Sequence, residues 1–193
     1  GPLGNLECRG ELAAGPRTLD CPMKIALVGN PNCGKTSLFN TLTGARAKVA
    51  NLPGVTVSPS VADLPTSGPD GTQIQLVDLP GTYSLQPKAM DEAVTRDALL
   101  NPVDSQRPEG IVLVMDSANL KRNLYLSLQT LDLGLPTVVV VNETAPTVWS
   151  QVDLEQSLGC PVFPVHALNG RGCDALLDAL RDWPSKVPPL DTE

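Results

Sequence analysis

The sequence is poor in aromatic residues and in histidine, and it contains no long apolar run. Aromatic side chains make up 3% of its 193 residues, so a hydrophobic core has to be built from Val, Leu, Ile and Ala. The single histidine, His166, excludes a metal site built from several histidines. No apolar stretch approaches the roughly 20 residues that a helix needs to cross a bilayer. The net charge of −7 disfavours a general binder of nucleic-acid backbones.

The five cysteines are an odd number, and their spacing matches no zinc or disulfide framework, which favours a reducing compartment. Residues 1–22 have no apolar periodicity and open with Gly1-Pro2, the pair that a common tag-removing protease leaves behind. We expect this segment to be such a remnant, or else a disordered leader. We expect residues 23–184 to form one domain and residues 185–193 to be a frayed tail.

From residue 23 onward the hydrophobic pattern alternates between strands and helices. GIVLVMD and PTVVVVN are continuous apolar runs, typical of buried parallel strands, and KIALVG and CPVFPV predict two more strands. TQIQLVD alternates apolar and polar residues, which predicts a strand near an edge of the sheet. KTSLFNTLTG predicts a helix that stops at Gly44, and GCDALLDALRDW predicts the last one. Between the strands GIVLVMD and PTVVVVN, we expect a helix with Leu124, Leu128 and Leu131 on its buried face. The pattern predicts an α/β fold with a doubly wound, mostly parallel sheet of about six strands, helices on both faces, and ligands at the carboxyl ends of the strands.

The strongest motif is GNPNCGKT, residues 29–36, which fits the phosphate-loop pattern G-x-x-x-x-G-K-[ST]. It follows a predicted strand and opens a predicted helix, which disfavours the alternative of a chance glycine-rich turn. The backbone N–H groups of such a loop surround phosphate oxygens at a helix N-terminus. Lys35 is predicted to reach the β and γ phosphates, and Thr36 to ligate Mg²⁺. The nucleotide-binding residues predicted here are Asn30, Pro31, Asn32, Cys33, Gly34, Lys35, Thr36 and Ser37.

A second motif, VDLPG, follows Lys35 by roughly forty residues and is typical of a γ-phosphate sensor. Asp78 is predicted to hold Mg²⁺ through water, and the Gly81 N–H to meet the γ-phosphate; the alternative is that Asp78 only forms a turn. Between the motifs, KVANLPGVTVSPS suits a mobile loop. Thr56 is the candidate second Mg²⁺ ligand, or else an ordinary strand threonine. Gly54 and Val55 are predicted to contact the nucleotide beside it.

GNPNCGKTSLFNTLTG, NLPGVTV, DLPGTYSL and NLKRNLYLSLQTLDLGLP together resemble the N-terminal G domain of the FeoB family of prokaryotic ferrous iron transporters. The resemblance runs from about Met23 to about Asn142 and resumes at LGCPVFPV. It implies that residues 23–184 are a Ras-like P-loop NTPase domain. It also implies slow GTP hydrolysis with Mg²⁺, a membrane permease domain in the same polypeptide, and a place at the cytoplasmic face of the bacterial inner membrane.

The resemblance also implies roles for single residues. Many family members are stimulated by K⁺, and the residue at the place of Asn32 helps to hold that cation, which offsets charge between the β and γ phosphates. The alternative for Asn32 is a loop-stabilising side chain. Leu52 stands where the family commonly has an aromatic residue. Thr82 stands where Ras-like GTPases have a water-orienting Gln, which predicts slow turnover. The residues expected to carry catalysis are Asn32, Lys35 and Gly81.

The base-recognition motif departs from the usual Asn-x-x-Asp. Asn142 is present, but the Asp position is Ala145, which cannot accept the two hydrogen bonds that guanine N1–H and the 2-amino group donate. Losing that charge-assisted pair costs on the order of 2–4 kcal/mol, so weakened guanine specificity is predicted. Glu143 is the alternative acceptor. The remaining residues predicted to contact the base are His166, near the usual Ser position, Ala167, whose N–H would donate to guanine O6, and Leu168.

The segment after Asn142 looks a few residues shorter than in the family. A shortened connection favours exchange of elements between two copies, so a homo-oligomer is one expectation. Two other functions fit the motifs. One is a nucleotide-sensing gate that does not hydrolyse GTP. The other is an RNA-associated, K⁺-dependent GTPase, against which the acidic charge and the lack of a basic domain argue, so no nucleic-acid partner is expected.

Overall fold

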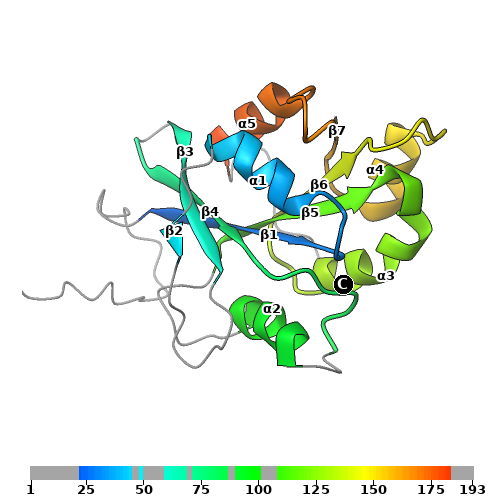
Figure 1. The fold of residues 1–193 in the computed structure, drawn as a ribbon, viewed down its shortest axis with the longest axis horizontal. Helices are drawn as coiled ribbons and strands as arrows, with labels where there is room; N and C mark the ends of the chain where they lie inside the picture. The colour runs from blue at the N-terminus through cyan, green and yellow to red at the C-terminus, as the bar shows by residue number, and fades with distance from the viewer. Residues whose placement is uncertain are drawn as a thin grey trace, which may run out of the picture.

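The structure, a computed structural model, describes residues 22–44, 48–49, 59–68, 71–86, 90–100 and 108–183. Within these ranges the chain forms a seven-stranded sheet in the order β2-β3-β4-β1-β5-β6-β7, with helices on both faces (Figure 1). The strands are β1 (Met23–Gly29), β2 (Lys48–Val49), β3 (Ser60–Ser67), β4 (Gln73–Asp78), β5 (Gly110–Asp116), β6 (Thr137–Asn142) and β7 (Val162–Val165). The helices are α1 (Lys35–Thr43), α2 (Met90–Leu100), α3 (Leu120–Leu131), α4 (Gln151–Leu158) and α5 (Cys173–Arg181), with a 3-10 turn η1 (Ser117–Asn119).

The sheet is mostly parallel, as predicted. The pairs β4–β1, β1–β5, β5–β6 and β6–β7 are parallel, and only β2 and β3 run antiparallel to their neighbours. Six strands have four or more residues, and the seventh, β2, has two. The predicted doubly wound, mostly parallel sheet of about six strands with helices on both faces is therefore confirmed.

The central strands are mainly apolar because each of their faces packs into a different core. In β5, Val112 and Val114 pack with residues of α1 and α5, whereas Ile111, Leu113 and Met115 pack with residues of α2, α3 and α4. Figure 1 shows the same division, with α1 and α5 on one side of the sheet and α2 and α3 on the other. Alternating residues thus serve opposite cores, which explains why the interior positions of β5 and β6 are all apolar.

Helix α3 buries only part of the face that the leucine spacing predicts. Leu131 is buried and Leu124 packs against the same core, as expected, but Leu128 does not. Leu128 is 54% exposed, and the buried positions include the polar residues Asn123, Ser127 and Thr130. Each of these finds a local partner: Ser127 Oγ donates to the Asn123 carbonyl at 2.9 Å, and Thr130 Oγ1 donates to the Leu126 carbonyl at 2.8 Å. Asn123 Oδ1 accepts the backbone N–H of Asp116 at 2.6 Å. Because their polar atoms are paired, these side chains are buried without a large desolvation cost.

Three elements have no clear signal in the sequence: β3, α2 and α4. Pro65 lies inside β3, where the pairing with β4 is irregular between Asp63 and Ser67, and a proline is tolerated at such a place. Helix α4 buries only Leu158, so it shows no apolar periodicity, although Ser150 caps its first turn by accepting from the Asp153 N–H at 3.2 Å. Among the described residues, none of the helices combines the length and apolarity that a membrane span requires.

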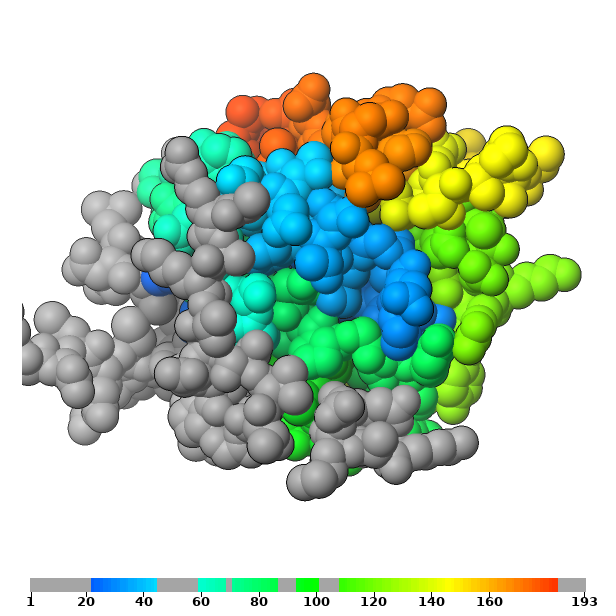
Figure 2. All heavy atoms as spheres, viewed as in Figure 1, coloured from blue at the N-terminus to red at the C-terminus, as the bar shows by residue number. Residues whose placement is uncertain are grey.

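Five loops follow the carboxyl ends of β1, β4, β5, β6 and β7, and all of them lie at one edge of the sheet. Figure 2 shows the blue surface of residues 30–34 and α1 bordered by the green surface of the segment after β4. In a doubly wound sheet this edge is where ligands bind.

Candidate functional site

Residues 30–34, between β1 and α1, form a tightly curled loop. Asn32 and Gly34 both have a left-handed backbone, with φ of 63° and 88°. Asparagine tolerates this conformation better than most residues. At Gly34 a side chain is excluded by space as well, since a Cβ atom there would lie 2.0 Å from Asn142 Nδ2. The loop therefore has the curled backbone at a helix N-terminus that phosphate binding needs.

The two predicted phosphate and metal motifs meet at this loop. Lys35 Nζ forms an ion pair with Asp78 Oδ1, and Thr36 Oγ1 donates to Asp78 Oδ2 at 3.2 Å. The Lys35 side chain is only 8% exposed, so water screens its charge little and its interaction with Asp78 is strengthened. A hydroxyl and a carboxylate side by side are oxygen ligands of the kind that Mg²⁺ prefers, so these residues fit the predicted metal.

The segment after β4 contacts the phosphate loop directly. A Cβ atom on Gly81 would lie 2.9 Å from Pro31 Cα, and the Thr82 N–H donates to the Gly29 carbonyl at 3.1 Å. The Thr82 hydroxyl donates to the Ser84 carbonyl at 2.7 Å, so it is engaged within its own turn. Gly81 is thus placed beside the loop, and the residue after it offers no side chain for proton transfer.

Asn142 connects the phosphate loop to the loop after β7. Its Nδ2 donates to the Cys33 carbonyl at 3.1 Å, and its Oδ1 accepts the Ala167 N–H at 3.0 Å. The side chain is 4% exposed. The sequence predicts Asn142 as a nucleotide contact but not as this link. The Ala167 N–H, which the sequence assigns to guanine O6, is used here by Asn142.

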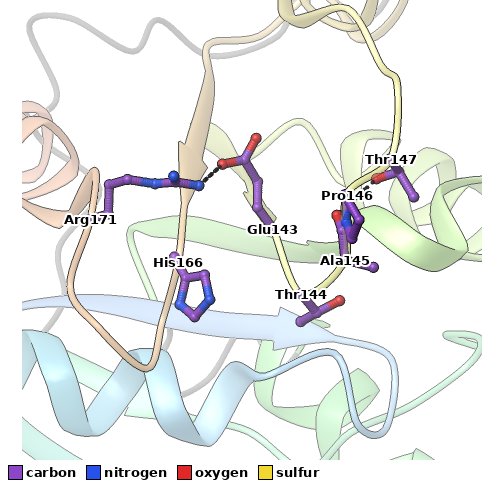
Figure 3. Close-up of a pocket in the computed structure, with 7 residues that line it drawn as sticks. All are labelled: Glu143, Thr144, Ala145, Pro146, Thr147, His166 and Arg171. Atoms are coloured by element: carbon purple, nitrogen blue, oxygen red, sulfur yellow. Dashed lines mark hydrogen bonds and ion pairs between the residues drawn. The ribbon is translucent and has the colours of Figure 1, made fainter.

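A cavity of about 350 Å³ lies beyond Asn142, between the loops after β6 and β7 (Figure 3). Arg171 Nη2 donates to Glu143 Oε2 at 2.5 Å, so the carboxylate that was the alternative base acceptor is directed at a guanidinium. Ala145 contributes only backbone and a methyl group to the wall. The lining residues are Glu143, Thr144, Ala145, Pro146, Thr147, His166 and Arg171.

Asp116, at the end of β5, supports this cavity and was not singled out in the sequence. It pairs in register with Asn142 and accepts a hydrogen bond from the Thr144 hydroxyl. Burial alone would raise the pKa of Asp116, but hydrogen bonds from Thr144, Asn119 and the Ala118 N–H outweigh it and lower that pKa below its usual value. The signal that would have found it is an aspartate at the end of a buried strand next to the strand of the base motif.

The structure places the remaining predicted residues in different surroundings, and some of them lie outside the part of the chain that it describes. Gly54, Val55 and Thr56, together with Leu52, lie outside the described residues. Leu168 is 82% exposed and does not line the cavity. The Cys33 side chain packs into the core below the loop, where burial raises the pKa of its thiol to about 11.

Two further residues, one in the loop and one in α1, are the last of those predicted to bind the nucleotide. Asn30 is 4% exposed, and in the described part of the chain neither polar atom of its side chain has a hydrogen-bond partner. Ser37 is half-buried in the first turn of α1.

Comparisons with known proteins agree with this geometry. A family model described as "Ferrous iron transport protein B" matches residues 23–180. The Fe(2+) transporter FeoB of Salmonella typhimurium is 42% identical over 159 residues, which are 80% of this chain and 20% of the relative. The chain therefore spans about a fifth of the length of the curated relatives it matches.

Solved structures give the same result. The G domain of the T. maritima FeoB iron transporter is 37% identical, has a TM-score of 0.72, and is matched over 82% of this chain and 96% of that one. A mutant of S. thermophilus NFeoB bound to GDP is 38% identical with a TM-score of 0.73, over 86% of this chain and 62% of that one.

Proposed function

The chain belongs to the FeoB family, as a G domain, and on that premise we propose that it binds GTP and GDP with Mg²⁺ and hydrolyses GTP slowly. The observation that carries the proposal is the meeting of Lys35, Thr36 and Asp78 below a curled phosphate loop. A relative of known structure, the S. thermophilus NFeoB mutant, has GDP bound. Residues 23–184 are the extent that we propose for the domain.

Each residue at the phosphate end has a distinct role in this proposal. Lys35 and the loop N–H groups bind the β and γ phosphates, and the Gly81 N–H meets the γ-phosphate. Mg²⁺, held by Thr36 and Asp78 together with Thr56, would supply charge compensation for the phosphates. The described motifs contain no general base, so positioning and charge stabilisation carry the reaction and turnover is slow.

Asn32 is the residue that we assign to a stimulating K⁺. The measurement is phosphate release at saturating GTP with Mg²⁺, in K⁺ against Na⁺. Wild type should turn over faster in K⁺, and Asn32→Ala should lose that difference while keeping its rate in Na⁺. No turnover in either salt would favour the nucleotide-sensing gate that does not hydrolyse GTP.

We further propose that guanine specificity is weakened. The Ala145 side chain offers no acceptor, and the Glu143 carboxylate is paired with Arg171, so we expect the two charge-assisted bonds to guanine to be lost. Their loss corresponds to about 2–4 kcal/mol, or roughly 30- to 1000-fold in affinity. Titration calorimetry of GDP and ADP on wild type and on Ala145→Asp tests this. A wild type that already prefers GDP by about a thousandfold would refute the proposal.

The partners follow from the length of the relatives. Because the chain spans about a fifth of a protein named as an Fe(2+) transporter, we propose that it acts at the cytoplasmic face of the bacterial inner membrane, tethered to a permease domain of the same polypeptide. A nucleic-acid partner is disfavoured by the net charge of −7. The expected homo-oligomer is tested by size-exclusion chromatography with light scattering, where a clean monomer would remove it.

A further inference from the structure

A buried hydroxyl on α2 donates to the backbone beside the γ-phosphate sensor of the proposed function. Thr95 lies in the middle of α2, and its side chain is fully buried. Its Oγ1 atom donates to the carbonyl of Pro80 at 2.8 Å. Pro80 directly precedes Gly81, whose N–H is proposed to meet the γ-phosphate. The bond therefore joins α2 to the residue next to the sensor.

The acceptor of this bond and the sensor group belong to the same peptide unit. The carbonyl of Pro80 and the N–H of Gly81 are joined through one C–N bond, and in a planar trans peptide they point in opposite directions. A hydrogen bond that fixes the direction of the carbonyl therefore also fixes the direction of the N–H. Because Thr95 binds the carbonyl, the Gly81 N–H is directed away from α2. Within the described residues this N–H has no hydrogen-bond partner.

This peptide plane has little else to fix its orientation. A rotation of the plane changes ψ of Pro80 and φ of Gly81, and glycine adopts φ of either sign at little cost. Gly81 is not one of the described glycines with a positive φ. Half a turn of the plane would carry Gly81 into the positive region. It would also direct a carbonyl oxygen to the place of the N–H, where it would repel a phosphate.

The next peptide unit is held from another direction. The Thr82 N–H donates to the Gly29 carbonyl at 3.1 Å, so the plane after Gly81 is tied to the start of the phosphate loop. The plane before Gly81 is tied to α2 through Thr95. Figure 1 shows α2 on the face of the sheet opposite to α1, the helix that follows the phosphate loop. The backbone on each side of Gly81 is thus fixed by one hydrogen bond.

We propose that Thr95 is a positioning residue for the γ-phosphate, because its hydroxyl holds the Pro80–Gly81 peptide plane with the Gly81 N–H directed at the site. The inference rests on the proposed binding of GTP, and it adds the side chain that orients the sensor. GDP has no γ-phosphate, so its binding does not use this N–H. Loss of the Thr95 hydroxyl therefore weakens the binding of GTP, slows its hydrolysis and leaves the binding of GDP unchanged.

Thr95→Val tests the proposal, because valine has nearly the shape of threonine and lacks the hydroxyl. Titration calorimetry with Mg²⁺ should show the affinity for the β,γ-imido analogue of GTP falling by roughly 3- to 10-fold, with the affinity for GDP unchanged. Phosphate release at saturating GTP should slow by a similar factor. Thr95→Ser keeps a hydroxyl and should restore both the analogue affinity and the rate.

Thr130→Val is the matched control. Thr130 is also fully buried, and its Oγ1 donates to a backbone carbonyl at the same distance of 2.8 Å, but within α3. This variant should lower the melting temperature about as much as Thr95→Val and leave both affinities unchanged.

The outcomes separate the inference from the function on which it rests. If Thr95→Val loses affinity for GDP as well, or loses none for the analogue, the inference is overturned and the proposed function stands. A Thr95→Ser variant that behaves like the valine variant would also overturn it. A wild type that binds neither GDP nor the analogue would overturn the proposed function, and the inference with it.

Discussion

Replacing Asn142 by alanine tests whether one buried amide holds the two ends of the site together. Its Nδ2 and Oδ1 atoms bind the Cys33 carbonyl and the Ala167 N–H, at 3.1 and 3.0 Å. Both residues are buried, with exposed fractions of 2% and 0%. The substitution therefore leaves a buried acceptor and a buried donor without a partner, in addition to a small cavity.

The expected cost follows from these two groups. An unsatisfied buried polar group costs about 1–3 kcal/mol, so two of them should lower the free energy of unfolding by about 2–4 kcal/mol once some relaxation is allowed. In a domain of this size each 1 kcal/mol shifts the melting temperature by about 2–4 °C. Asn142→Ala should thus lower the melting temperature by roughly 5–15 °C.

Urea unfolding followed by circular dichroism measures the loss directly, by linear extrapolation of the free energy. Asn119→Ala is the control, because Asn119 is an exposed asparagine whose Nδ2 donates to Asp116 at 2.7 Å. That exposed bond should contribute less than about 1 kcal/mol. If Asn142→Ala costs no more than Asn119→Ala, the reasoning about the buried link is refuted.

Three further predictions concern packing, titration and local order. Gly110→Ala should lower the free energy of unfolding by about 1–3 kcal/mol, because its Cβ would lie 1.9 Å from the Trp183 ring; an unchanged melting temperature would contradict this. The folded Cys33 thiol keeps its proton up to a pKa of about 11 while the unfolded thiol loses it near 9.0, so unfolding free energy should fall as pH rises between these values. This decrease in unfolding free energy with pH should be smaller in Cys33→Ala. An equal decrease in both proteins would refute the assignment to the Cys33 thiol. Gln129→Leu removes the acceptor of the Leu85 N–H, bound at 2.8 Å, so hydrogen exchange at Leu85 should accelerate about tenfold; an unaltered rate would argue against this anchor.

The parts of the fold that could be predicted are those whose signal is local. The runs of β5 and β6 are apolar because both faces are covered, and α1 places Leu38, Phe39 and Leu42 in one core as the spacing indicates. The face of α3 could be predicted only in part from leucine spacing, because its buried polar residues are paired within the helix and with Asp116. Helix α4 buries too little for its period to be visible.

The candidate site divides in the same way. The phosphate end follows from two motifs whose residue types imply their partners, and Lys35, Thr36 and Asp78 do meet. At the base end, the contacts join loops that are 25 or more residues apart, such as Asn142 with Ala167 and Glu143 with Arg171. Neither pair has a spacing or pattern that marks it, so only the folded chain brings these residues together.

The alternation along β5 also has a practical consequence for following the molecule in solution. Val112 and Leu113 are neighbours in sequence, yet their methyl groups belong to different cores, one shared with α1 and α5 and the other with α2, α3 and α4. Selectively labelled methyl groups at these two positions would therefore act as paired reporters. A nucleotide that rearranges the helices on one face of the sheet should change the chemical shift of one of these methyl groups and not of the other. The methyl group that responds would show which layer of helices moves when the nucleotide binds.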